Sequence, residues 1–536
     1  MSVSTAQLTP LRFLERSSAV FGDECAIVHG SRRLSYEEFA GHATRLARAL
    51  QAAGVKPGDR VAYLCPNIPE MLIAHFAVPL AGAVLVAINT RLAPEEVRYI
   101  CDHSGASLLV VDAELAETVA PVAGQLQSVR EIITITDGQA AAPGSAAPDG
   151  RGYDELLATG SDEPLPWTVA DELETITINY TSGTTGRPKG VMYTHRGAYL
   201  NALGEVIHSE HSPASVYLWT LPMFHCNGWC TTWALTAIGG RHVCLRAVRG
   251  DEIWRLLDEQ HVTHLNGAPT VLTAIANAAE AHPLGRTLTV TTAGAPPSPT
   301  TIAQMEALGA RIVHVYGLTE TYGPYSVCEW QPGWEDLETE ARATLLARQG
   351  VGMIQAQRLR VVDPEMADVP ADGETMGEIV MQGNNVMKGY FEDSEATAEA
   401  FRGGWFHSGD LGVMHPDGYV QLLDRAKDVV VSGGENISTV EVEQALVSHD
   451  SVLEAAVIGV PDDRWGERPK GFVVLKSDRD ASESELVEHV RGRIARYKSP
   501  DLIEFVAELP KTSTGKVQKY ELREREWAGH EARIQG

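Results

Sequence analysis

Apolar residues recur at helical spacing near the start of the chain. Residues 35–54 place their apolar side chains on one face of a helix, with Ser35 suited to cap its start and Gly54 to end it. Short apolar runs at 107–112, 242–246 and 311–317 predict strands between further helical segments. Because buried strands that alternate with helices form parallel sheets, the pattern predicts an α/β fold as far as about residue 420. The predicted core face of the first helix contains Phe39, Ala43, Leu46, Ala47 and Leu50.

The most apolar segment of the chain is residues 73–88. It contains a histidine, a proline and a glycine, and it is shorter than the roughly 20 residues that cross a bilayer. A buried helix, a turn at Ala81-Gly82 and a buried strand account for it, so no membrane span is predicted. The N-terminus lacks a basic region followed by an apolar stretch, and we therefore expect no secretory signal.

The pattern changes from about Gly377 onward. Three short strands with glycine turns predict a small antiparallel or barrel unit, after which helix 439–449, strands 454–460 and 470–476 and helix 483–496 predict a last α/β unit. We place a domain boundary at Asp424-Arg425, which divides the chain into domains 1–424 and 425–536. Segment 138–152, rich in glycine, alanine and proline, is predicted to be a surface loop.

The composition is that of an ordinary globular protein. A chain of 536 residues is too long for one core and indicates two or more domains. The net charge of −27 argues against nucleic-acid binding, because that needs a basic face. It does not argue against a small anionic ligand, which a few local cations and backbone amides can bind.

The chain contains seven cysteines, an odd number without clustering. This usage favours reduced thiols and predicts a cytoplasmic protein. Cys226 and Cys230 beside His225 suggest a zinc site, but no second pair of ligands follows at finger spacing. Buried thiols are the favoured interpretation.

Residues 180–190 read YTSGTTGRPKG and are too poor in apolar side chains to be core. They follow a strand-like run and precede a segment, 190–203, that we predict to be helical. Strand, glycine loop and helix together favour an anion-binding nest of backbone amides. The segment fits neither the Walker pattern nor the dinucleotide fingerprint. A flexible surface turn is the alternative.

The loop closely resembles the signature loop of the adenylate-forming enzymes, which include acyl-CoA synthetases, luciferases and the adenylation domains of peptide synthetases. Five further motifs follow in the family's order, and together they cover essentially the whole chain. These are TAGAPPS (292–298), VYGLTE (315–320), GWFHSGDLG (404–412), LLDRAKDVVVSGGENIS (422–438) and PKTSTGKVQKYELR (510–523).

The resemblance implies a fold and an activity. The fold is a large N-terminal domain of two doubly wound α/β subdomains plus a distorted β-barrel, followed by a small, mobile α+β C-terminal domain. The activity is ATP-dependent: a carboxylic acid and ATP give acyl-AMP and pyrophosphate, and acyl-AMP and coenzyme A then give acyl-CoA and AMP. The implied cofactors are ATP, Mg²⁺ and coenzyme A, and Mg²⁺ and cations offset charge that develops on the phosphates.

The resemblance also assigns the nucleotide site residue by residue. The loop residues are expected to hold the β- and γ-phosphates, Tyr316 to stack on adenine, Asp410 to grip the ribose hydroxyls, and Arg425 to contact ribose or phosphate. The phosphate group comprises Thr181, Ser182, Gly183, Thr184, Thr185, Gly186 and Lys189. Gly294, Ala295 and Pro296 are expected to form the other adenine wall.

Catalytic roles follow from the same motifs. Glu320 resembles the magnesium ligand and Thr319 a phosphate-contacting hydroxyl, although VYGLTE alone fits a helix start capped by Thr319. Lys516 resembles the mobile catalytic lysine that bridges the acid and the α-phosphate. Asp424 matches the family's hinge residue. Gly433, Gly434 and Glu435 are expected to approach the coenzyme A thiol after the small domain rotates.

The acid site is expected at LPMFHCNGW (221–229), which resembles the acyl-pocket segment of short- and medium-chain acyl-CoA synthetases, especially plant-type acyl-activating enzymes and methylthiopropionate-type ligases. His225 and Trp229 are expected to face the acyl group, with Gly317 in the same pocket. The indole limits pocket depth and favours compact acids, aliphatic or aromatic. Packing of Trp229 in the core is the alternative.

Two rival functions stay open at this point. One is an adenylating enzyme that passes the acyl group to an amine or to the thiol of a carrier protein. The other is a nucleotide-binding pseudo-enzyme, against which the presence of Lys516, Glu320 and Asp410 argues. The sequence does not identify the carboxylic acid, the pathway or the oligomeric state. A homodimer is one of the states left open.

Overall fold

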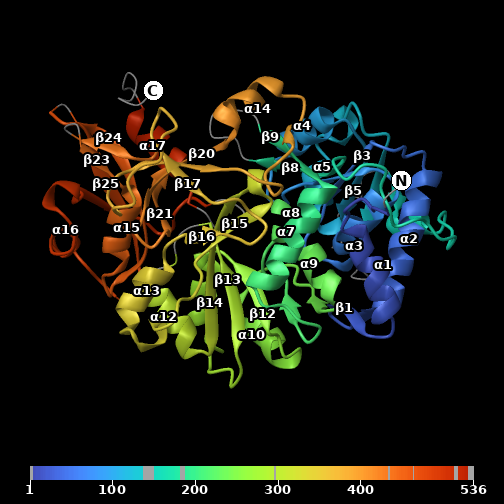
Figure 1. Cartoon of the computed structure of the whole chain (residues 1–536), viewed down its shortest axis with the longest axis horizontal. Coiled ribbons are helices and arrows are strands. Elements are labelled where there is room, and N and C mark those ends of the chain that lie inside the picture. Colours follow the sequence, from blue (N-terminus) through green and yellow to red (C-terminus); the bar gives the residue numbers. More distant parts are fainter. Residues whose placement is uncertain are drawn as a thin grey trace.

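The computed structural model describes four sheets and the helices that cover them (Figure 1). It describes residues 4–136, 150–181, 188–294, 297, 299–425, 427–432, 435–462, 464–477, 479–511 and 517–528, with backbone only at 299, 339, 340, 435 and 436. No helix in these ranges is long and apolar enough to cross a bilayer.

The first sheet has eight strands in the order β19-β9-β8-β4-β3-β5-β6-β7. Its strands from β8 to β7 are parallel, and β9 and β19 add an antiparallel edge. The strands are β3 (Arg60–Leu64), β4 (Val84–Ala87), β5 (Ala106–Asp112), β6 (Glu131–Ile135), β7 (Arg151–Gly152), β8 (Thr175–Thr181), β9 (Lys189–Thr194) and β19 (Gly389–Tyr390). Its helices are α2 (Tyr36–Ala52), α3 (Pro69–Leu80), α4 (Pro94–Ser104), α5 (Ala116–Val119) and α6 (Tyr153–Leu157).

The second sheet has nine strands in the order β16-β15-β14-β13-β12-β10-β11-β1-β2, with a parallel centre from β14 to β1. They are β1 (Cys25–His29), β2 (Arg32–Ser35), β10 (Val216–Leu218), β11 (Arg241–Val243), β12 (His264–Gly267), β13 (Leu288–Thr292), β14 (Ala310–Leu318), β15 (Gly323–Val327) and β16 (Val351–Gly352). The accompanying helices are α1 (Leu11–Val20), α7 (His195–His208), α8 (Cys226–Trp229), α9 (Thr231–Ile238), α10 (Gly250–Glu259), α11 (Pro269–Ala276), α12 (Pro299–Ala307) and α13 (Thr339–Leu346).

A four-stranded antiparallel sheet and a C-terminal sheet complete the fold. The former lies largely in the part of the chain where a small antiparallel or barrel unit is expected. It contains β17 (Arg360–Val362), β18 (Gly377–Met381), β20 (Phe406–Met414) and β21 (Val420–Arg425), with α14 (Ser394–Ala400) nearby. The latter contains β22 (Val430–Ser432), β23 (Glu435–Ile437), β24 (Val452–Asp462), β25 (Gly466–Leu475) and β26 (Leu502–Phe505), with α15 (Thr439–Val447), α16 (Glu483–Arg491) and α17 (Lys519–Trp527).

The apolar cores follow this division. One continuous cluster joins the first three sheets, with Tyr63 on β3, Tyr217 on β10 and Ile379 on β18 among its buried members. The C-terminal sheet has two cores of its own, whose described members all lie beyond residue 429. The α/β class and the division into a large and a small unit are therefore confirmed, and Figure 1 shows the small unit (orange to red) at one end of the molecule.

Several predicted elements form as expected. Helix α2 begins after Ser35, whose side chain accepts from the Glu38 amide in a capping box, and the five predicted core residues are fully buried. The apolar segment 73–88 forms the end of α3, a turn with Gly82 at φ +83°, and β4.

Three predictions about element bounds need correction. The strand expected at 242–246 is shorter and ends at Val243. The helix expected at 483–496 ends at Arg491, because Gly492 follows and glycine favours helix poorly. The loop expected at 138–152 contains a short strand, β7, at Arg151–Gly152, while its residues 138–149 lie outside the described ranges.

Glu205 on α7 is a buried carboxyl, and burial raises its pKa from 4.5 to about 8. The folded state therefore binds a proton that the unfolded state loses, so stability falls as the pH rises from about 4.5 to about 8 and is level above that. We expect Glu205→Gln to remove this slope, which is about 1.4 kcal/mol per pH unit for one group. Thermal unfolding of both proteins between pH 5 and pH 9 measures it.

The matched control is Glu210→Gln, at an exposed carboxylate that pairs with Arg311 at 3.0 Å. Its unfolding temperature should run parallel to that of the wild type across the same pH range. A stability difference between Glu205→Gln and wild type that is the same at pH 5 and pH 8 would contradict the prediction.

Candidate active site

The glycine-rich segment 180–190 joins two antiparallel strands. Thr181 ends β8, Lys189 begins β9, and the two residues are register partners. The predicted strand–loop–helix order is therefore wrong, because β-branched and aromatic side chains in 189–194 favour a strand and α7 begins only at His195. No helix N-terminus follows the loop directly, so the strand–loop–helix argument for anion binding there does not hold.

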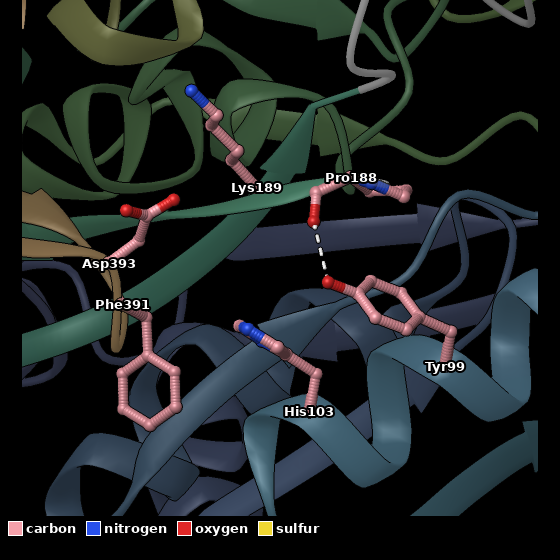
Figure 2. Close-up of a pocket in the computed structure, with 6 residues that line it drawn as sticks. All are labelled: Tyr99, His103, Pro188, Lys189, Phe391 and Asp393. Carbon is pink, nitrogen blue, oxygen red and sulfur yellow. Dashed lines mark hydrogen bonds between the residues drawn. The ribbon is translucent and has the colours of Figure 1, made fainter. Parts of the chain in front are cut away.

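Helix α4 supports both ends of this segment (Figure 2). The hydroxyl of Tyr99 donates to the Pro188 carbonyl at 3.2 Å, and His103 Nδ1 lies 2.8 Å from the hydroxyl of Tyr180. A small cavity of about 130 Å³ lies between these contacts. It is lined by Tyr99, His103, Pro188, Lys189, Phe391 and Asp393. The two ends of the loop are thus fixed to the same helix.

Tyr390 lies between Lys189 and Glu320. The Lys189 ammonium is 4.8 Å from the centre of the Tyr390 ring, and the Tyr390 hydroxyl donates to Glu320 Oε1 at 2.9 Å. Burial raises the pKa of Glu320, so its charged form needs a positive partner. A buried carboxylate oxygen suits Mg²⁺, a cation that prefers oxygen ligands. Sequence reasoning missed Tyr390 because only the pairing of β19 with β9 brings it here.

We expect Tyr390→Phe to lower kcat/KM for Mg-ATP about tenfold, since one hydrogen bond to a charged group is lost. Added Mg²⁺ should restore part of the loss, because the carboxylate itself remains. Initial rates of acid-dependent pyrophosphate release over a range of Mg²⁺ concentrations measure both effects. The control is Tyr497→Phe, at an exposed tyrosine of the C-terminal unit. A Mg²⁺ dependence identical to that of the wild type would contradict the assigned role.

Another group of contacts joins Thr319, Cys226 and His225. The Thr319 carbonyl accepts from the Tyr193 hydroxyl at 2.6 Å, and Cys226 Sγ lies 3.5 Å from Thr319 Oγ1 and 3.8 Å from His225 Nε2. Thr319 lies inside a three-residue turn that follows Leu318, so it does not cap a helix.

The cysteines near this turn are buried thiols. Burial raises the pKa of Cys226 to about 12, and that of Cys230 is raised as well, so neither is a ready metal ligand. Within the described ranges no group of three His, Cys, Asp or Glu side chains could hold a metal ion. All seven cysteines lie in the described ranges, and none of them forms a disulfide.

A second group of contacts joins Tyr316, Asp410 and Arg425. The Tyr316 hydroxyl donates to Asp410 Oδ2 at 2.7 Å, and Arg425 Nε lies 3.2 Å from Oδ1. Oδ1 is buried and accepts no hydrogen bond within the described part of the chain. A buried carboxylate oxygen in this state is suited to accept from a ligand hydroxyl, as the predicted ribose contact requires. Register pairing of β20 with β21 places Asp410 opposite Arg425.

Gly317 and Trp229 meet at Gly323. A Cβ at Gly317 would lie 1.9 Å from the Gly323 carbonyl oxygen, where the pairing of β14 with β15 shifts register, so close strand contact requires glycine here. A Cβ at Gly323 would lie 2.7 Å from Trp229 Cδ1. The Trp229 side chain is buried in a small apolar cluster. The other members are Leu221, Cys226, Ala293, Val313, Val315, Val327 and Met353.

Of the other predicted site residues, two are described and ten lie outside the described ranges. Gly294 lies in an exposed position after β13 with φ +93°, and Glu435 begins β23. The remaining ones, Ser182, Gly183, Thr184, Thr185, Gly186, Ala295, Pro296, Gly433, Gly434 and Lys516, lie outside the described ranges.

Asp424, the predicted hinge residue, binds the C-terminal unit. Its Oδ2 accepts from the Thr439 amide at 2.5 Å and from Thr439 Oγ1 at 2.6 Å, at the start of α15. Lys519 on α17 donates to Thr439 Oγ1 and pairs with Glu443 at 2.7 Å. The last strand of the large unit is thus joined to two helices of the small one.

The chain is similar to known proteins over nearly its whole length. Residues 14–391 match the model of the AMP-binding enzyme family, and residues 441–516 match that of the AMP-binding enzyme C-terminal domain. The chain is 45% identical to a peroxisomal acetate/butyrate–CoA ligase of Arabidopsis thaliana, over 96% of this chain and 94% of that protein. It is 42% identical to a 4-hydroxybutyrate–CoA ligase of Metallosphaera sedula, again over 96% and 94%.

A third relative and one solved structure extend the comparison. The chain is 41% identical to a 2-methylpropanoate–CoA ligase of Humulus lupulus, over 97% of this chain and 95% of that protein. The crystal structure of an anthranilate CoA ligase in complex with anthranoyl-AMP superposes with a TM-score of 0.86, at 26% identity and over 98% of each chain.

Proposed function

Because this chain belongs to the AMP-binding enzyme family, we propose that it is a ligase that joins a short-chain or otherwise compact carboxylic acid to coenzyme A. The enzyme uses ATP, Mg²⁺ and coenzyme A, as AMP-binding CoA ligases do. The observation that carries the proposal is a pair of contact groups at the two ends of segment 316–320. Tyr316 contacts Asp410 at one end, and Glu320 at the other end accepts from Tyr390, whose ring lies against Lys189.

The first half-reaction needs charge stabilisation around the phosphates. Lys189 supplies a fixed positive charge, and Thr319 a hydroxyl donor. Glu320 would hold Mg²⁺, which when bound offsets the charge that develops as pyrophosphate leaves. The contact from Tyr390 keeps the Glu320 carboxylate oriented before the nucleotide arrives. Preorganised groups of this kind avoid reorganisation during the reaction.

The nucleoside is held on the other side of the site. Asp410 Oδ1, which accepts no hydrogen bond from the described residues but lies 3.2 Å from Arg425 Nε, would accept from ribose hydroxyls, while Tyr316 keeps the carboxylate oriented. Arg425 lies where it balances the negative charge of Asp410. The ring of Tyr316 and the turn at Gly294 would bound the adenine.

The acid would lie against His225 and Trp229. The low exposure of Trp229 and its contact with Gly323 leave little room to enlarge the site, which favours compact acids. The relatives named for acetate, butyrate, 4-hydroxybutyrate and 2-methylpropanoate support the same size class.

The second half-reaction would follow a rotation of the small domain about Asp424, with the domain boundary at Asp424-Arg425. The separate cores of the C-terminal unit support a rigid-body movement. Gly433, Gly434 and Glu435 would then meet the pantetheine thiol, and Lys516 would act in the first half-reaction only.

An assay with ATP, Mg²⁺ and a panel of short aliphatic, branched, thioether and aromatic acids tests the proposal. Each acid is offered with coenzyme A, with an amine or with a phosphopantetheinylated carrier protein, and the products are identified by mass spectrometry. Formation of CoA thioesters from compact acids supports it. Acyl-AMP formation with transfer only to the amine or the carrier supports the rival function, and no turnover with any acid supports a pseudo-enzyme.

We propose a reducing compartment, the cytoplasm, for this chain, because its seven cysteines are odd in number and unclustered and none of them forms a disulfide. Relatives named as peroxisomal offer the alternative. Fractionation of cells followed by immunodetection of the chain distinguishes the two.

A further inference from the structure

One turn of left-handed helix begins directly after His225 and contains Trp229, the two residues proposed to face the acid. Five consecutive residues have positive φ: Cys226 at 46°, Asn227 at 45°, Gly228 at 59°, Trp229 at 55° and Cys230 at 60°. Only one of the five is glycine. A left-handed helix is unfavourable for L-residues, because Cβ approaches the following carbonyl oxygen. Such a turn persists only where its surroundings hold it.

Asn227 supplies the main hold on the turn. Its side chain is fully buried and reaches two elements of the first sheet's layer, α3 and β8. Nδ2 donates to His75 Nε2 at 3.0 Å, and Oδ1 accepts from Thr177 Oγ1 at 2.6 Å and from Asn179 Nδ2 at 2.7 Å. Asparagine also tolerates positive φ better than most residues. Three hydrogen bonds to α3 and β8 therefore hold the Asn227 side chain in place.

His75 is held in the form that this contact requires. Its Nδ1 donates to the Met71 carbonyl at 2.8 Å, which leaves Nε2 as the acceptor for Asn227. Burial lowers the pKa of His75 to about 4, so the imidazole stays neutral at ordinary pH. The tautomer of His75 and the orientation of the Asn227 amide are therefore consistent with each other.

The turn is confined from the sides as well. A Cβ at Gly228 would lie 2.5 Å from the ring of Trp219, so the backbone passes directly over that indole. On the other side Trp229 packs against Gly323 of β15, and Cys230 Sγ donates to the Tyr322 carbonyl at 3.7 Å. A change in the turn must therefore move Trp229 relative to β15.

We propose that Asn227, supported by His75, is a positioning residue for acid specificity: it holds turn 226–230 left-handed and thereby fixes His225 and Trp229 at the acyl group. This inference rests on the proposed function. Within the described part of the chain, the hydrogen bonds of Asn227 go to His75, Thr177, Asn179 and Thr232, none of which belongs to the nucleotide site. In the same part of the chain, the turn itself touches the nucleotide site only through Cys226, whose Sγ lies 3.5 Å from Thr319 Oγ1. Loss of the support should therefore alter acid selection much more than nucleotide binding.

Two substitutions separate the contributions of Asn227. Asn227→Gly keeps positive φ accessible but removes all three side-chain hydrogen bonds. Asn227→Asp keeps the acceptor for Thr177 and Asn179 but places a carboxylate oxygen against the lone pair of His75 Nε2. Protonation of His75 would turn that repulsion into a charge-assisted hydrogen bond. Only the aspartate variant should therefore improve as the pH falls.

The experiment measures KM and kcat for acetate, butyrate and hexanoate, and KM for ATP, with the full-length chain. In both variants we expect KM for butyrate to rise about tenfold, which corresponds to about 1.4 kcal/mol of lost acid binding, with KM for ATP within about twofold of wild type. The hexanoate-to-acetate ratio of kcat/KM should rise. For Asn227→Asp, KM for butyrate relative to wild type should be lower at pH 6 than at pH 8.

His75→Leu and His195→Leu form a matched pair of controls, since leucine has no acceptor for Asn227 Nδ2. Both histidines are buried with a pKa lowered to about 4, but His195 contacts Thr9 instead of the turn. The first substitution should reproduce the rise in KM for the acid, and the second should not. Hydrogen–deuterium exchange of the peptide that covers 219–236 should be faster in the Asn227 variants and in His75→Leu only.

Unchanged acid KM and unchanged chain-length preference in both Asn227 variants would overturn the inference, as would equal increases in KM for acid and ATP. Unchanged exchange in peptide 219–236 would overturn it independently of turnover. If the wild type itself forms no CoA thioester, the proposed function fails, and the exchange measurement still tests whether Asn227 supports the turn.

Discussion

An Asp410→Asn variant is expected to lose about 100-fold in kcat/KM for ATP in acid-dependent pyrophosphate release. The substitution keeps the shape of the side chain but removes its charge, so the contact to ribose hydroxyls weakens from a charge-assisted to a neutral one. It also leaves Arg425, which lies 3.2 Å from the carboxylate, without its partner. Two such losses of about 1.5 kcal/mol each account for about 100-fold. Calorimetric titration with ATP should show the same loss in affinity.

Tyr316→Phe is the graded control for this prediction. It removes the donor to Asp410 Oδ2 and keeps both the carboxylate charge and the aromatic ring. We expect a loss of about tenfold, which corresponds to one hydrogen bond to a charged acceptor. If Asp410→Asn bound ATP as tightly as the wild type, the ribose contact would be disproved, and the carboxylate would serve only to orient Arg425.

The spacing of apolar residues within a short segment is sufficient to predict a helix or strand whose buried face follows that spacing. Helix α2 shows this, because its cap at Ser35, its core face and its end are all encoded within residues 35–54. The apolar segment 73–88 shows it as well, since its length and its glycine alone argue against a membrane span, and it folds as helix, turn and strand. The family motifs predict residues of a nucleotide site, and three of the predicted residues, Tyr316, Asp410 and Arg425, lie together in the structure. Their role at a nucleotide stays a prediction.

The remaining features depend on contacts between distant segments. The segment after the glycine loop looks helical in isolation, yet pairing with β8 turns its first residues into β9. Tyr390 carries no motif and reaches Glu320 only because β19 joins the edge of the first sheet. Asn227 is one polar residue in an apolar segment, and its three partners come from residues 75, 177 and 179. No local period encodes such pairings, so tertiary structure decides them.

The lysines near the C-terminus differ in what the structure assigns to them. Lys511 pairs with Glu454 at 2.6 Å, and Lys519 is held by Glu443 and Thr439 in the network around Asp424. Both ammonium groups therefore have structural partners within the C-terminal unit. Lys516 lies between them in the motif, and its assignment as the catalytic lysine rests on the resemblance of that motif.

We expect Lys516→Ala to lower the rate of acyl-AMP formation about 1,000-fold, the scale seen when a group that stabilises developing charge is removed. Thioester formation from supplied acyl-AMP and coenzyme A should stay within about threefold of wild type, because the bond between the acid and the α-phosphate, which Lys516 is proposed to help form, already exists. Pyrophosphate release and CoA-thioester formation measure the two half-reactions separately. Lys511→Ala, which removes only the ion pair with Glu454, should leave both rates near wild type. Equal losses in the two half-reactions of Lys516→Ala would show that the lysine supports the fold of the small domain instead of the transfer of charge.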